Sequence, residues 1–177
     1  HHPRWQLLTR TIDAYPTPDT TAGQNELAQL HHLAGVVAQE QRRFEDAEAH
    51  YRRALDLKLK LGNERGAAST YQSLGIIAQE RRRFEDAEAH CRRALDLFLK
   101  FGDEHGAALT YHQLGVVALE RQRFEDAEAH YRRALDLKLR LGDEHSAALT
   151  YHNLGIVAQE QRRFADAEAH YHRALDL

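Results

Sequence analysis

Residues 43–57 read RFEDAEAHYRRALDL, and nearly the same letters return at 83–97, 123–137 and 163–177. One phenylalanine therefore recurs every 40 residues, as Phe44, Phe84, Phe124 and Phe164. A fixed period of about 20–50 residues is typical of a solenoid, in which each unit buries its apolar face only against its neighbours. The sequence thus predicts an array of about four repeats.

Each repeat reads as a pair of helices, most plainly in the third copy. Helical spacing of apolar residues predicts one helix over about 103–120 and a second over about 124–141, with polar residues 121–123 as the turn. Asp103 is placed to cap the first helix, and Gly142 allows the left-handed backbone that ends the second. The apolar stripe of the second helix comprises Phe124, Ala127, Tyr131, Ala134, Leu135 and Leu139.

The recurring residues of the helix pair resemble a known family pattern. In the third copy they are Tyr111, Leu114, Gly115, Phe124, Ala127, Tyr131 and Ala134. This pattern resembles the tetratricopeptide repeat, although the period exceeds the family's usual length of about 34 residues and the proline that commonly follows the second helix is missing. The long-repeat subclass is the most similar. The resemblance implies an all-α fold, an α-solenoid in which antiparallel helix pairs form a right-handed superhelix.

The repeats divide the chain unevenly. We expect the array to cover 24–177, in units of about 24–62, 63–102, 103–142 and 143–177, with the last unit truncated. Residues 1–23 do not fit the period. They predict a short helix over about 4–14 that covers the first repeat, then a linker over 15–19 containing two prolines. His1 and His2 are interpreted as the remnant of a tag.

Composition excludes several kinds of partner. The net charge of −3 gives no overall positive field, so neither nucleic acid nor an anionic membrane is expected to bind. No run approaches the roughly 18 apolar residues of a membrane-spanning helix. The single cysteine, Cys91, precludes an internal disulfide and favours a reducing compartment, so a cytoplasmic location is expected. Cys91 also replaces a tyrosine of the other copies, which predicts a buried, inert thiol.

No residue pattern indicates catalysis. Most of the 13 histidines fall into three sets, each made of copies of one repeat position, and members of a set are expected about 10 Å apart by helix packing distance. Zinc bonds of about 2 Å cannot span that gap. Glu48 and Arg52 form an ordinary helix-surface pair at i,i+4, and the arginines at 81–83 are interpreted as a solvated turn. There is no glycine-rich phosphate loop and no serine elbow. We therefore expect no enzyme activity, no cofactor and no metal.

The inner face of the array is the candidate site, because the resemblance implies that first helices line a concave groove. The candidate peptide-binding residues are Ser69, Gln72, Ser73, Gln79, Leu109, His112, Gln113, Val116, Leu119, Glu120, Leu149, His152, Asn153 and Glu160. Four of these repeat positions vary among the last three units, whereas the second helices are nearly identical, which indicates either diversification for binding or chance; the four are 69/109/149, 72/112/152, 73/113/153 and 79/119/159. No lysine or arginine lies at these positions, so the carboxylate clamp of some family members is not carried over.

Four glutamates, Glu40, Glu80, Glu120 and Glu160, end the predicted first helices. They form either a solvated ridge or a contact for a basic ligand. The function expected is a scaffold module that binds a protein or peptide. The alternative is a self-associating structural or sensor array within a larger signalling protein, since an uncapped last repeat is expected to associate end to end.

Overall fold

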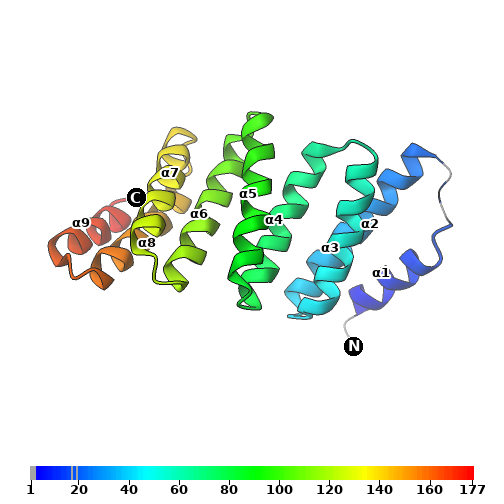
Figure 1. Cartoon of the computed structure of the whole chain (residues 1–177), viewed down its shortest axis with the longest axis horizontal. Coiled ribbons are helices and arrows are strands. Elements are labelled where there is room, and N and C mark those ends of the chain that lie inside the picture. The colour runs from blue at the N-terminus through cyan, green and yellow to red at the C-terminus, as the bar shows by residue number, and fades with distance from the viewer. Residues whose placement is uncertain (1–2, 17, 19) are drawn as a thin grey trace. The chain divides into compact units, whose positions relative to one another are not determined.

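The computed structural model describes residues 3–16, 18 and 20–177, and within these it contains nine α-helices and no strand (Figure 1). In chain order the helices are α1 (Pro3–Asp13), α2 (Thr21–Glu40), α3 (Phe44–Lys60), α4 (Glu64–Glu80), α5 (Phe84–Lys100), α6 (Glu104–Glu120), α7 (Phe124–Arg140), α8 (Glu144–Glu160) and α9 (Phe164–Leu175). The predicted all-α solenoid of about four helix pairs is confirmed. The interpretation of His1 and His2, and the linker at positions 17 and 19, lie outside the described residues.

The chain divides into two compact units, residues 1–97 (unit 1) and 98–177 (unit 2), with the boundary inside α5. In unit 1, α1 packs on α2, α2 on α3 and α3 on α4. In unit 2, α6 packs on α7, α7 on α8 and α8 on α9. Within each unit, therefore, a helix pair contacts the first helix of the pair that follows, as a repeat array requires.

The ends of the helices follow the sequence signals, with one addition. Oδ1 of Asp103 accepts a hydrogen bond of 2.8 Å from the backbone N–H of Gly106, which caps α6. Gly142 has a φ of 71° after α7. Between α6 and α7, however, Gln122 is left-handed with a φ of 58°, although it is not glycine. The Arg123 N–H donates to Ala118 O over 2.8 Å and closes this turn.

The core of the first, third and fourth repeats combines alanines with one tyrosine ring, whereas Cys91 takes the place of the ring in the second. In unit 2, Ala118, Ala127, Tyr131, Leu154 and Val157 belong to one buried cluster. The Tyr131 ring lies against Gly115, where an added Cβ would come within 2.6 Å of the ring. Glycine inside a helix lowers stability by about 1 kcal/mol relative to alanine. It is required at position 115 because the side chain of any other residue would collide with the Tyr131 ring.

One position in the predicted apolar stripe is wrong. Leu139 is 44% exposed, whereas its neighbour Lys138 is only 3% exposed. Positions 127, 131, 134 and 138 share the helix face that points to the core, and position 139 lies one step around it. The alkyl stem of Lys138 packs as an apolar residue, and its ammonium reaches Oγ1 of Thr150 at 2.8 Å.

Candidate functional site

The structure places the candidate residues on first helices. Those on α4 belong to unit 1, and those on α6 and α8 belong to unit 2. None of the fourteen side chains is buried: Leu109, Glu120, Leu149, His152 and Glu160 are exposed, and the remainder are half-buried. The core is filled by residues such as Leu114 and Leu154, and of the candidates Val116 and Leu119 are half-buried and pack against its edge. The candidate side chains therefore remain accessible after the repeats have packed.

Exposed leucines mark this face. Leu109 and Leu149 occupy the same repeat position on α6 and α8 and are 38% and 52% exposed. On α2, Leu33 is 50% exposed. Burying the exposed part of such a side chain against a ligand contributes roughly 25 cal/mol per Å² of apolar area, so each leucine is a potential anchor for a partner.

His112 and Asn153 are brought together across two repeats of unit 2. Nδ1 of His112 lies 3.3 Å from the Lys138 ammonium and 3.2 Å from Oγ1 of Thr150, and Nε2 lies 3.2 Å from the amide of Asn153. The amide atom of Asn153 that faces Nε2 is the nitrogen Nδ2, which only donates, so Nε2 accepts this hydrogen bond. These two predicted groove residues thus also join α6 to α8.

Burial sets the charge of this cluster. It lowers the pKa of His112 to about 4, and the nearby charge of Lys138 acts in the same direction. Burial also lowers the pKa of Lys138 to about 8, against the opposing effect of Asp143. At neutral pH the imidazole is therefore neutral and serves as an acceptor.

Unit 1 repeats the arrangement. Nζ of Lys58 donates to Oγ1 of Thr70 over 2.7 Å, and that hydroxyl lies 3.2 Å from Nδ1 of His32. Burial lowers the pKa of Lys58 to about 8. The buried lysine is therefore a recurring device for joining one repeat to the next, and sequence reasoning missed it because a lysine reads as a surface residue.

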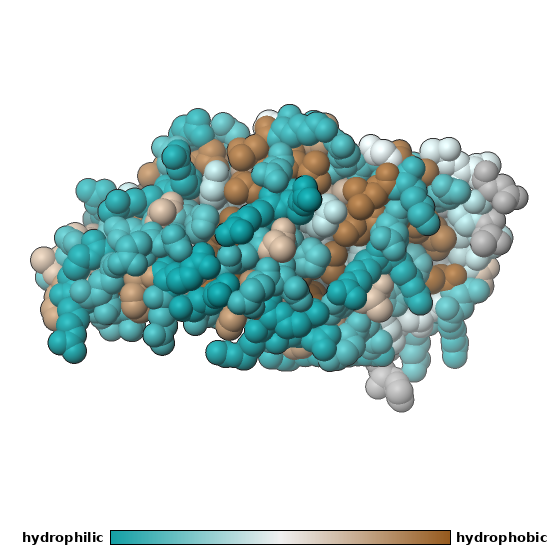
Figure 2. All heavy atoms as spheres, in the orientation of Figure 1, coloured by the Kyte–Doolittle hydropathy of each residue, from teal (hydrophilic) through white to brown (hydrophobic). Residues whose placement is uncertain are grey.

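An apolar hollow of about 470 Å3 lies between α1 and α2, and it was not predicted. Its lining is Arg4, Leu7, Leu8, Thr11, Leu30, Leu33, Val36, Val37 and Glu40. Leu7 and Leu33 are largely exposed at its edge. Hydrophobic residues interrupt the hydrophilic surface over the N-terminal helices on the face shown in Figure 2. Because the spacing 30, 33 and 37 follows one helix face, α2 contributes a continuous apolar wall.

The short helix α1, which the sequence predicted as a cover for the first repeat, is fixed by one aromatic residue. The rings of Trp5 and His50 form a T-shaped pair, with centroids 5.4 Å apart and an angle of 88° between the planes. The guanidinium of Arg43 lies 4.1 Å from the centre of the Trp5 ring. These contacts join α1 to α3, so the wall that α1 contributes to the apolar hollow is held in place.

An acidic hollow of about 550 Å3 lies beside the apolar one and shares Val36 and Glu40 with it. It is lined by Val36, Gln39, Glu40, Arg42, Phe44 and Glu80. Glu40 is the last residue of α2 and Glu80 the last of α4. Nη2 of Arg42 approaches Glu80 only to 4.0 Å. Two of the four predicted ridge glutamates thus converge in unit 1.

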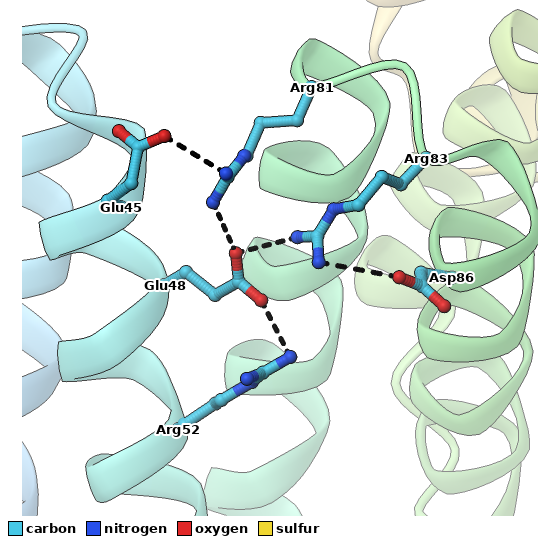
Figure 3. A network of polar contacts seen from close by, with 6 residues as sticks. All are labelled: Glu45, Glu48, Arg52, Arg81, Arg83 and Asp86. Carbon is cyan, nitrogen blue, oxygen red and sulfur yellow. Dashed lines mark hydrogen bonds and ion pairs between the residues drawn. The ribbon is translucent and has the colours of Figure 1, made fainter.

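The second helices carry a different network, which corrects two expectations (Figure 3). Glu48 on α3 is buried, and its carboxylate binds Arg52 at 2.7 Å, Arg81 at 2.9 Å and Arg83 at 2.6 Å. It is therefore not an ordinary surface pair with Arg52. Arg81 and Arg83 are only half-exposed, because they pair with a carboxylate of the preceding repeat. The turn geometry brings them there, with Arg82 left-handed between them at a φ of 56°.

Electrostatics favour the ionised form of this carboxylate. Burial alone would raise the pKa of Glu48. The hydrogen bond from Arg83 and the charges of Arg52, Arg83 and Arg81 outweigh it and hold the pKa below its usual value. In unit 2, Glu128 binds Arg163 at 2.6 Å in the same way. The network therefore joins the first repeat to the second and the third repeat to the fourth.

Other reactive groups are confined. Cys91 is buried as predicted, and burial, with a smaller effect of Glu88, raises the pKa of its thiol to about 12. Among the described residues, no group of three histidine, cysteine, aspartate or glutamate side chains could hold a metal ion. In the same part of the chain, no helix combines the length and apolar character needed to cross a membrane.

A family model and several solved structures are similar to this chain. The family model described as tetratricopeptide repeat matches residues 26–100, 66–140 and 106–177. No curated protein sequence matches the chain. Among solved structures, BtubC (BKLC) from P. vanneervenii is similar with a TM-score of 0.86 and 24% identity, over 97% of this chain and 70% of that protein.

Two further solved structures are longer proteins. A signal transduction ATPase with numerous domains from Pyrococcus horikoshii, which has a tetratricopeptide repeat sensor, gives a TM-score of 0.82 at 17% identity. The Rap conjugation gene regulator of plasmid pLS20, solved with the Phr* peptide, gives 0.76 at 22% identity. Both alignments cover 97% of this chain, but it spans only 26% and 46% of those proteins. At these identities the likeness shows the fold.

Proposed function

Because the chain belongs to the tetratricopeptide repeat family, we propose that it is a non-catalytic binding module whose first helices hold a segment of another protein or a peptide. The observation that carries this proposal is that each first helix has buried core residues and, separately, candidate residues that stay accessible. One side supplies the core, whereas the candidate residues on the other side are all left exposed or half-buried. Exposed leucines beside amides and carboxylates are the mixture that an extended or helical ligand requires.

One of the similar structures supports the proposal because it contains a bound peptide. The Rap regulator was solved with a peptide bound, so a repeat array of this fold accommodates a peptide. In this chain no lysine or arginine stands at the fourteen candidate positions. Recognition therefore proceeds through apolar contacts, hydrogen bonds and acidic groups.

An unbiased peptide display selection on the full chain tests the proposal. The test variant carries aspartate at Leu33, Leu109 and Leu149 on first helices, which are 50%, 38% and 52% exposed. The matched control carries aspartate at Leu59, Leu99 and Leu139 on second helices, which are 44%, 54% and 44% exposed. Enriched peptides should lose binding to the first variant and keep it with the second. The opposite pattern, or no enrichment, contradicts the proposal.

Self-association is the second candidate, and one observation favours it. A hollow of about 330 Å3 on α9 is lined by Phe164, Tyr171 and Leu175 among others, and Phe164 and Leu175 are largely exposed. The equivalent Phe124, Tyr131 and Leu135 pack in the core cluster of unit 2. Sedimentation equilibrium distinguishes the candidates: a concentration-dependent oligomer that Phe164→Ser abolishes supports assembly, and a monomer at all concentrations excludes it.

A further inference from the structure

We infer that unit 1 binds a basic–apolar protein segment, whose apolar side chain enters the hollow between α1 and α2 and whose lysine or arginine reaches Glu40 and Glu80. This inference rests on the proposed function and names the chemistry of its ligand. It depends on the contact between two hollows that differ in character, one apolar and one acidic.

The apolar hollow is suited to an anchoring side chain. Its volume of about 470 Å3 exceeds that of a leucine or phenylalanine side chain, and leucines from both helices line it. Leu7 and Leu33 are exposed at its edge although they are large and apolar. Because Trp5 fixes α1 against His50 and Arg43, both walls exist before a ligand arrives. A preformed site lowers the entropic cost of binding.

The acidic hollow is suited to a cation. Glu40 and Glu80 are each the last residue of a helix, where the helix dipole adds negative potential and stabilises a bound positive charge. Glu40 forms no hydrogen bond or ion pair with another described residue. Arg42 offsets one of the two carboxylates, but at 4.0 Å from Glu80 its contact is loose. With Glu40, Glu80 and Arg42 in its lining, this hollow keeps one net negative charge, which complements a lysine or arginine; Arg4 lines only the adjoining apolar hollow.

Because the two hollows adjoin, the apolar residue and the basic residue of the ligand must lie close together in its sequence. Val36 and Glu40 line both hollows, so a chain that leaves the apolar hollow passes directly over Glu40. A short ligand segment therefore reaches both, with its apolar residue and its cation close together in sequence. An acidic segment would be repelled at the same point, which gives the site its selectivity.

Three fluorescein-labelled peptides on the full chain test the inference by fluorescence anisotropy: GSGLLSKRGSG, its acidic counterpart GSGLLSEDGSG, and GSGSSSKRGSG without leucines. The first should bind about tenfold more tightly than either of the others. Glu40→Gln combined with Glu80→Gln should weaken it about tenfold and reduce its sensitivity to salt. The matched pair Asp56→Asn and Asp96→Asn, which removes two exposed carboxylates on the second helices α3 and α5, should leave binding unchanged.

Charge reversal keeps the test independent of folding. Glu40→Lys should shift preference toward the acidic peptide while circular dichroism remains that of a helical protein. Equal binding of acidic and basic peptides, or no effect of Glu40→Gln with Glu80→Gln, overturns the inference. So does a Leu33→Asp variant that loses only self-association, because the occupant would then be a second copy. If display selection enriches peptides without the basic–apolar pattern, this inference fails while the proposed function stands; if it enriches none, both fail.

Discussion

The hydroxyl of Tyr51 donates a hydrogen bond of 2.8 Å to Oε1 of Gln39, which joins α3 to α2 within the first repeat. Tyr171 and Gln159 make the same bond at 3.2 Å in the fourth repeat. In the third repeat the tyrosine is retained as Tyr131, but the glutamine position is Leu119. The Tyr131 hydroxyl is consequently buried without a partner among the described residues.

Replacing Leu119 with glutamine should therefore stabilise the protein. A net hydrogen bond contributes about 1 kcal/mol, and an unsatisfied buried hydroxyl costs a similar amount. We expect Leu119→Gln to raise the free energy of unfolding by about 1 kcal/mol in urea titrations. In a Tyr131→Phe background the gain should disappear. An equal gain in both backgrounds would show that the missing bond is not its cause.

Phe98 and Gly106 form a second coupled pair. An added Cβ on residue 106 would come within 2.5 Å of the Phe98 ring. Gly106→Ala should therefore cost about 2 kcal/mol of unfolding free energy through overpacking, although alanine favours the helix. Lysine replaces Phe98 at the equivalent Lys58 and Lys138, so Phe98→Lys should remove most of that cost. A double-mutant cycle measures the coupling, and strictly additive effects would contradict the contact.

Glu48 should be far more important to stability than its neighbour Glu45. Glu48→Gln leaves Arg81 and Arg83 without their buried carboxylate and should cost about 2 kcal/mol. The side chain of Glu45 is 76% exposed and, among the described residues, pairs with Arg81 alone, at 3.0 Å. Glu45→Gln should therefore change the free energy of unfolding by no more than about 0.5 kcal/mol. Because the pKa of Glu48 is lowered on folding, its contribution is present above pH 4.5 and lost as pH falls below it. Equal acid sensitivity of wild type and Glu48→Gln would refute this role.

Lys138 should give the protein a pH dependence on the alkaline side. The unfolded chain keeps this proton up to about pH 10.5, whereas the folded chain releases it near pH 8. Between these values the unfolded state binds more protons, so the free energy of unfolding should rise with pH by roughly 2–3 kcal/mol. Lys138→Met removes the titrating group. Guanidinium titrations at pH 7 and pH 10 should show a smaller increase in the free energy of unfolding for the variant than for the wild type. Equal increases would show that the Lys138 ammonium is solvated in the folded protein.

The repeat period was enough to predict the helices, because apolar spacing and the caps at Asp103 and Gly142 are local signals. The 40-residue repeat also correctly indicated which helices pair. The left-handed Gln122 was not predictable in the same way, since its conformation is imposed by the bond between Arg123 and Ala118. A residue other than glycine adopts it because the surrounding helices determine it.

The contacts between repeats were harder to predict than the helices. The sequence pointed to His112 and Asn153 as variable inner residues, yet their bonds to one another and to Lys138 depend on which repeat lies beside which. The burial of Glu48 and Lys138 was missed for the same reason. A charged side chain is buried only when partners from another repeat reach it, and spacing along one helix does not reveal those partners. The apolar hollow beside Val36 depends on α1, whose contacts lie outside the repeat pattern.

The most direct test of the central claim is amide chemical-shift mapping by nuclear magnetic resonance, in which the labelled full chain is titrated with a peptide from the display selection. Binding through the first helices predicts that the shifted amides cluster on α2, α4, α6 or α8, with the side of those helices that carries Leu33, Leu109 and Leu149 most affected. Shifts confined to α3, α5, α7 and α9 would contradict the claim and place the binding surface on the second helices.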